Sequence, residues 1–273
     1  MSAGLATAPA GITPPAVAGP VTQLRVVRSE WLKLRALRST WCCALITIIL
    51  IVGVGAVLAG GKPYRVSPAH PAATAVSVSL YGILLAQLVI GVLGVLMFSG
   101  EYGTGMIRAS LAVVPARLPV LWAKLIAAAG LVLPVTLLAA VAEFFVATGI
   151  QSARGASAIS LADPGVLRTV IGASLYLSVA AVIGLALGAL LRKTAAGVAA
   201  FAGLFFVAPI VVTQLPPGIA GFARYLPSSA GGSLWGQPLA THPLGPWAGF
   251  AVLCGYAVVL TGLAAWRLRR RDA

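Results

Sequence analysis

Hydrophobic residues gather into six long runs along the chain, with short polar or basic segments between them. The runs cover residues 41–60, 76–98, 125–148, 170–191, 195–215 and 247–266. Each run is close to the roughly 20 residues that an α-helix needs to cross the apolar core of a bilayer. Because a membrane-spanning backbone must satisfy its own hydrogen bonds, the pattern predicts an all-α integral membrane protein with a six-helix transmembrane domain over residues 41–266.

A different pattern precedes the first run, over residues 21–40. Its apolar residues recur every three or four positions, and its basic side chains fall largely on the other side. The apolar set is Leu24, Val27, Trp31, Leu34 and Leu37, and the basic set is Arg25, Arg28, Arg35 and Arg38. This spacing predicts an amphipathic helix lying in the headgroup plane of the membrane, with a straight extension of the first span as the alternative. Residues 1–20 are uncharged and rich in Ala, Pro and Gly, so we expect a disordered cytoplasmic tail.

Composition supports the membrane assignment and argues against a soluble enzyme. Hydrophobic residues make up 60% of the chain and charged residues 9%, whereas soluble domains carry about 25% charged residues. The net charge of +14 would suggest nucleic acid in a soluble protein. Here the basic residues stand at the ends of apolar runs, where anionic headgroups lie, so we expect a lipid bilayer and no nucleic acid as partner.

The basic residues also predict the orientation. With the N-terminus inside, fourteen of the 19 Lys and Arg residues fall on the cytoplasmic side. The remaining ones are Lys62, Arg65, Arg154, Arg168 and Arg224. Because cytoplasmic loops carry the excess of Lys and Arg, both termini are expected in the cytoplasm, with residues 267–273 as a basic tail.

The connection before the last run, residues 215–246, is rich in Pro and Gly yet semi-apolar. A solvated loop would be more polar. The segment is expected on the external side, either as an ordinary surface loop or with a part that re-enters the membrane where protein covers its backbone.

Residues that carry chemistry are few. The Cys and His residues are not at metal-ligand spacing, and the chain has no G-x-x-x-x-G-K-[ST] motif, so we expect no metal site, no bound cofactor and no ATPase activity in this chain. Glu143 and Gln87 lie within spans and are candidates for a translocation path. The alternatives for Glu143 are an interfacial or water-reaching carboxylate and a hydrogen-bond acceptor at a helix interface, and the alternative for Gln87 is a polar link between helices.

Small residues and prolines in the spans predict how the helices pack. Gly184 and Gly188 form a G-x-x-x-G step, and Gly91 and Gly94 lie on the second span, so close helix contacts are expected within the subunit or at a dimer contact. Pro134 and Pro209 are predicted to kink the third and fifth spans, since each removes a backbone hydrogen bond.

The most informative segment connects the second and third spans and reads FSGEYGTGMIRASLAVVPARLPVLWAKL, residues 98–125. Its chemistry-bearing residues follow the pattern E-x3-G-x2-R-x2-L-x3-P-x-R-x6-K. They are Glu101, Gly105, Arg108, Leu111, Pro115, Arg117 and Lys124. This pattern resembles the cytoplasmic loop of ABC-2 type permeases, the membrane subunits of bacterial ATP-binding-cassette exporters. The sequence SEWLKLRALRSTW, residues 29–41, is similar to the segment that leads into their first span.

The resemblance implies an architecture like that of type V exporters, in the plasma membrane of a bacterium. It implies a half-transporter that pairs with a second permease chain, identical or related. The loop over residues 100–124 would then dock on a separate ATPase chain that holds ATP and Mg²⁺, with Glu101, Gly105, Arg108, Pro115 and Arg117 as the coupling residues.

Three other functional classes fit the sequence less well than a permease. The alternative function is that of a non-transporting polytopic membrane protein, such as an anchor, a sensor or an assembly subunit, in which the loop only obeys the positive-inside rule. A membrane-embedded enzyme lacks a catalytic cluster, and a self-sufficient secondary carrier would need more buried acids than this chain offers.

Overall fold

The computed structural model describes residues 22–61, 71–103, 117–157 and 159–270, and within these ranges it contains helices and no strand. Three predictions fall mainly outside these ranges. They concern the tail over residues 1–20, most of the loop over residues 100–124, and the end of the basic tail over residues 267–273.

Within the described residues, six helical stretches are long and apolar enough to cross a membrane, which confirms the predicted six-helix fold. They are α2 (Arg38–Ala59); α3, η1 and α4 (Pro71–Ser79, Leu80–Gly82 and Ile83–Gly103); α6 (Arg117–Ser152); α7 (Val166–Leu191); α8, η2 and α9 (Thr194–Ala202, Gly203–Val207 and Ala208–Thr213); and α12 (Pro246–Arg270). The second and third stretches extend well past the predicted runs, because a helix continues through polar residues such as Glu101 and Lys124 once its backbone bonds are formed.

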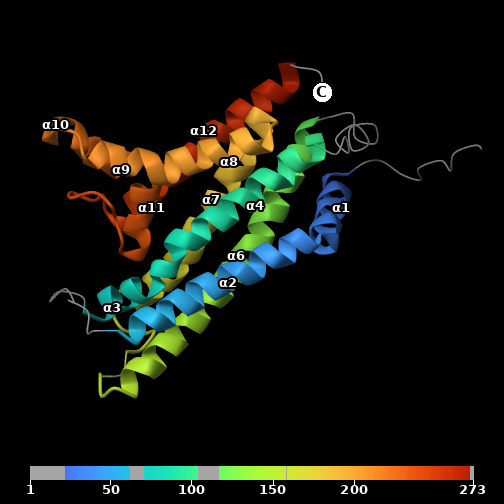
Figure 1. Ribbon diagram of the computed structural model, residues 1–273. Helices are drawn as coiled ribbons and strands as arrows, with labels where there is room; N and C mark the ends of the chain where they lie inside the picture. The colour runs from blue at the N-terminus through green and yellow to red at the C-terminus, as the bar shows by residue number, and fades with distance from the viewer. Residues whose placement is uncertain (1–21, 62–70, 104–116, 158, 271–273) are drawn as a thin grey trace, which may run out of the picture.

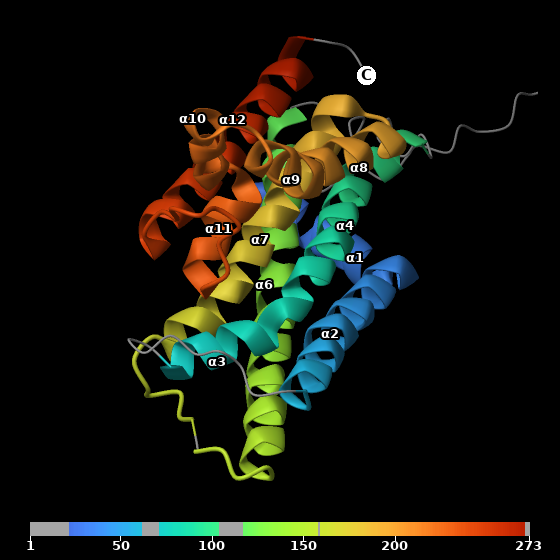
Figure 2. The same ribbon diagram turned by 60° about the vertical axis from the view of Figure 1, so that its left-hand side comes forward.

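The helix α7 runs through the middle of the bundle, with α4 and α6 beside it (Figures 1 and 2). Most of α7 is buried inside the chain, whereas only 22% of the fifth span and 22% of α12 is buried. Large aliphatic side chains cover these outer helices; Val258, for example, is 71% exposed. A helix surface of this kind is stable against lipid tails and not against water.

Glycines bring α4 and α7 into backbone contact. A Cβ atom at Gly184 would overlap the Gly91 carbonyl oxygen, and one at Gly94 would overlap the Ala181 carbonyl oxygen. At Gly188 it would lie 2.6 Å from the carbonyl oxygen of Val95. The glycines singled out in the sequence therefore pack two helices of the same chain together, which confirms the first of the two predicted uses.

The two prolines behave differently from each other. The helix α6 passes through Pro134 as one continuous helix. Pro209 follows η2, a single π-helical turn in which the Ala208 N–H bonds to the Gly203 carbonyl. Because a proline ring lacks the N–H and crowds the carbonyl four residues earlier, this wider turn accommodates it without breaking the span.

The segment before the last span is mostly folded into short helices. These are α10 (Pro217–Ala220), η3 (Gly221–Tyr225) and α11 (Pro227–Trp235). All nine residues of α11 are buried, and the helix packs against α7 and α12. A Cβ atom at Gly249 of α12 would overlap the Ala230 carbonyl oxygen of α11. Protein thus covers α11, which is the condition a re-entrant helix has to meet.

The amphipathic helix α1 (Gln23–Ala36) forms as predicted and turns away from α2 (Figure 1). Leu37 between them is extended, with φ −81° and ψ 120°, so α1 is not a straight extension of the first span. The predicted apolar positions at its two ends are not covered by protein, since Leu24 is 77% exposed and Leu37 is 51% exposed, and both are free to face lipid. The buried residues of α1 are instead Val26, Glu30 and Leu34.

Candidate functional site

Four charged side chains from three helices meet at the end of the bundle that carries α1. We call them the charge cluster: Glu30 and Lys33 of α1, Glu101 of α4 and Lys124 of α6. The Lys124 Nζ lies 2.7 Å from Glu30 Oε2 and 2.7 Å from Glu101 Oε1. The Lys33 Nζ lies 2.7 Å from Glu30 Oε1 and 3.1 Å from Glu101 Oε1. Each lysine therefore bridges both carboxylates.

Most of the charge cluster is buried, so its ion pairs lie away from water. The side chains of Lys124, Glu30 and Glu101 are 4%, 6% and 8% exposed, and that of Lys33 is 34% exposed. Buried charges are tolerated when each is paired and hydrogen-bonded, and here two cations balance two anions. Burial alone would lower the pKa of Lys33, but hydrogen bonds and the negative charges of Glu30 and Glu101 outweigh it and raise the pKa above its ordinary 10.5.

The helix α1 is fixed to α6 beyond the charge cluster. Val26 packs in a small apolar cluster with Val120 and Ala123 of α6. The Gln23 side-chain amide donates a hydrogen bond to the Pro119 carbonyl at 3.0 Å. Leu34 joins Leu121 and Leu125 in a larger apolar cluster with residues of α4. One side of α1 is therefore attached to α6 along most of its length.

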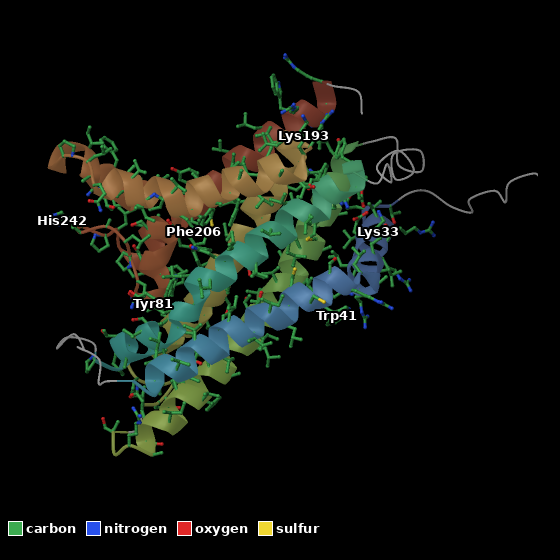
Figure 3. The ribbon with its side chains drawn as sticks, in the orientation of Figure 1. Lys33, Trp41, Tyr81, Lys193, Phe206 and His242 are labelled. Carbon is green, nitrogen blue, oxygen red and sulfur yellow. The ribbon has the colours of Figure 1, made fainter. Side chains whose placement is uncertain are left out.

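The end of α4 is also tied to the turn between α7 and α8. The hydroxyls of Ser99 and Thr194 are 2.9 Å apart. The guanidinium of Arg192 lies 5.3 Å from the centre of the Tyr102 ring, and Arg192 itself holds a left-handed backbone with φ 58°. Lys33 and Lys193 accordingly appear toward the same end of the bundle in Figure 3, with Tyr81 and His242 toward the other.

Only part of the predicted coupling set lies within the described residues. Glu101 is there, and its partner Lys124 belongs to the same sequence pattern, so the structure joins the first and last residues of that pattern. Gly105, Arg108 and Pro115 lie outside the described residues, and Arg117 begins α6 with its side chain undescribed. The sequence patterns did not identify Glu30 and Lys33 as site residues. The available signal was Glu30, a lone acid among the apolar positions of a basic helix.

Gln87 is explained by a structural contact. The Tyr176 hydroxyl of α7 donates a hydrogen bond to its Oε1, and both side chains are 1% exposed. Polar side chains of neighbouring membrane helices join in this way because hydrocarbon offers them no other partner.

Glu143 has no comparable contact. It is completely buried, and its carboxylate packs against the backbone of Gly55 in α2, where a Cβ atom would overlap it. The Ser79 hydroxyl beside it donates to the Val76 carbonyl at 2.9 Å. Neither carboxylate oxygen has a hydrogen-bond partner among the described residues. The water-reaching alternative is wrong for this arrangement of the helices, because Glu143 is fully covered.

Within the described ranges, no group of three or more His, Cys, Asp or Glu side chains could hold a metal ion. The geometry therefore supplies an ion-paired junction of helices and a buried carboxylate.

The six apolar helices define a multi-pass membrane protein. The chain matches the family described as ABC-2 family transporter protein over residues 26–211, from α1 through α9 and including the whole charge cluster. Because the match covers more than half of the sequence, the chain belongs to the ABC-2 transporter family, and the family implies an ABC ATPase as partner. A search of curated proteins found no match.

Proposed function

We propose that the chain is the membrane subunit of an ABC exporter and that it couples to a separate ATPase through the loop between α4 and α6. The observation that carries the proposal is the charge cluster. Glu101 and Lys124 lie on the two helices that flank the loop, and both bind Glu30 of α1 either directly or through Lys33. A push on the loop would therefore move α1, α4 and α6 together.

The proposal includes the cellular setting. The membrane is the plasma membrane of a bacterium, and both termini and the charge cluster face the cytoplasm. The distribution of Lys and Arg supports this orientation. ATP and Mg²⁺ bind to the partner ATPase, this chain is not an enzyme, and a second permease chain, identical or related, completes the transporter. These parts rest on the family.

The test reverses the charge of one loop residue. We expect Arg108→Glu to abolish co-purification with a co-expressed ABC ATPase and to remove the stimulation of its ATP hydrolysis, because a docking contact would become repulsive. Glu101 is unsuited to this test, since its loss would disturb the charge cluster. Arg168→Glu, at an exposed position of α7 on the predicted external side, is the matched control. Unchanged co-purification of Arg108→Glu would contradict the proposed coupling.

We assign the translocation path to Glu143 rather than to Gln87. Gln87 is already bonded to Tyr176, whereas the Glu143 carboxylate lies beside the Ser79 hydroxyl without a hydrogen-bond partner among the described residues and packs against Gly55 of α2. An unpartnered carboxylate in an apolar interior is costly. Water or cargo that entered between α2 and α6 during transport would relieve that cost.

This assignment can be tested without knowledge of the cargo. In a background without Cys42, Cys43 and Cys254, we expect Glu143→Cys to react with a membrane-impermeant thiol reagent during ATP turnover with the partner and not in its absence. Gln87→Cys is the control and should stay unlabelled in both states. If the two positions reacted alike, Glu143 would not line the path.

A further inference from the structure

A cavity of about 280 Å³ lies at the end of the bundle opposite the charge cluster. It is lined by Phe222, Arg224 and Tyr225 of η3 and by Thr241 and His242 of the segment after α11, together with Ala220, Gly221 and Ala240. Figure 3 places His242 at this end, below α10 as labelled in Figure 1. The cavity approaches the size of small-molecule sites in proteins, which start near 300 Å³.

The charge of the cavity is uncompensated. The sequence has no Asp or Glu between Asp163 and Asp272, so no acid of this region can pair with Arg224 or His242. Asp163 itself accepts a hydrogen bond from the Ser160 N–H at 2.9 Å. Arg224 stacks on the Tyr225 ring at 4.8 Å, and its Nε is buried without a hydrogen-bond partner among the described residues. This buried N–H lacks an acceptor, and because it belongs to a positively charged guanidinium, an anionic oxygen is the acceptor that suits it best.

The surroundings of the cavity are apolar and aromatic. Phe222 of the lining is 65% exposed, and Ile219 and Leu239, which adjoin the lining residues Ala220 and Ala240 in the chain, are 50% and 47% exposed; Trp247, at the start of α12, is 64% exposed. Exposed aromatic side chains at the end of a span mark the level of lipid headgroups. A ligand that suits both features has an anionic head and an apolar body.

We propose that this cavity binds the phosphate headgroup of a membrane lipid or of a lipid-like amphiphile. The Arg224 guanidinium contacts the phosphate oxygens, Thr241 and His242 supply further hydrogen bonds, and the apolar rim holds the body of the ligand. Guanidinium groups recognise phosphate through paired N–H donors, which a lysine cannot reproduce. The proposal does not depend on the ATPase or on the direction of transport.

Binding to the purified full chain tests the proposal, using dioctanoyl phosphatidylglycerol as the probe. Dioctanoylglycerol supplies the same apolar body without the phosphate, and inorganic phosphate supplies the head alone. Native mass spectrometry and isothermal titration read the affinity. We expect the phospholipid to bind, and the other two compounds to bind at least about tenfold more weakly, because the phosphate contact and the apolar contact add.

Variants locate the site. Arg224→Gln should weaken phospholipid binding at least about tenfold, and Arg224→Lys should restore only part of it. Arg168→Gln, an exposed arginine at the same predicted side, should leave binding unchanged. The elution volume in size-exclusion chromatography checks that each variant is folded. Equal binding by Arg224→Gln and the unchanged chain would overturn the site. If dioctanoylglycerol bound equally well, the cavity would not recognise the phosphate headgroup. If inorganic phosphate bound equally well, the cavity would not recognise the apolar body of a lipid.

Discussion

Lys124→Met is expected to lower the free energy of unfolding by about 3–5 kcal/mol, the cost of removing one partner from a buried ion pair. Methionine keeps most of the length and apolar volume of the lysine chain, so the packing beside Phe98 is largely preserved. The positive charge is lost. Glu30 and Glu101 then share Lys33 alone, and the buried cluster carries an excess negative charge.

Lys33→Met is the matched comparison, because it removes the same charge from a less buried side chain. Lys33 makes the same two contacts from a side chain that is 34% exposed, against 4% for Lys124. Water can replace a partly exposed partner, so we expect the loss of stability to be about 1 kcal/mol for Lys33→Met. Both variants remove one positive charge from the same site. A difference between them therefore measures burial and not net charge.

A double variant separates charge from packing. Lys124→Met combined with Glu101→Gln removes one charge of each sign and restores neutrality in the cluster. We expect it to be less destabilised than the sum of the single variants, with an interaction energy of about 1–3 kcal/mol. Unfolding of the chain in lipid nanodiscs measures stability, and hydrogen exchange of α1 reports whether that helix has come loose. Strict additivity, or a stable Lys124→Met, would contradict the role given to this lysine.

Hydrophobic patterning was sufficient to predict the spans but not their depth in the bundle. A run that faces lipid and a run that faces protein are equally apolar, because both are buried from water. The central α7 and the exposed α12 therefore read alike in the sequence, although most of α7 is buried and most of α12 is not. The spacing of the glycines was a better guide to helix contacts, since α4 and α7 approach each other closely at Gly91, Gly94 and Gly184.

The charge cluster shows where sequence reasoning stops. Glu101 and Lys124 were recognised from one continuous pattern, but their ion pair depends on how α4 and α6 cross. Glu30 lies 94 residues from Lys124, and no local signal joins them. Counting lysines for orientation treated Lys33 and Lys124 as solvated charges. In the structure, the two basic residues are instead the partners that allow two acids to be buried in the junction.

Gly184→Ala is expected to destabilise the chain by about 3 kcal/mol or more, although it adds a single methyl group. Overpacking a well-filled interior typically costs about 1–3 kcal/mol when side chains can adjust. Here the new methyl group would meet the carbonyl oxygen of Gly91, which belongs to the backbone of α4 and cannot rotate away. The two helices would have to separate, and the neighbouring contacts of Gly94 and Gly188 would be lost with them.

Gly53→Ala is the matched control, since it is the same substitution within the membrane-spanning helix α2. A Cβ atom there would meet no atom within 4 Å. Alanine is a better helix former than glycine by about 1 kcal/mol, so this variant should be neutral or slightly more stable. Gly94→Ala should resemble Gly184→Ala, because its methyl group would meet the Ala181 carbonyl oxygen of the facing helix. Unfolding midpoints in the same nanodiscs rank the three variants. If Gly53→Ala were as harmful as Gly184→Ala, flexibility of the glycines, and not close contact between α4 and α7, would be the property that the chain requires.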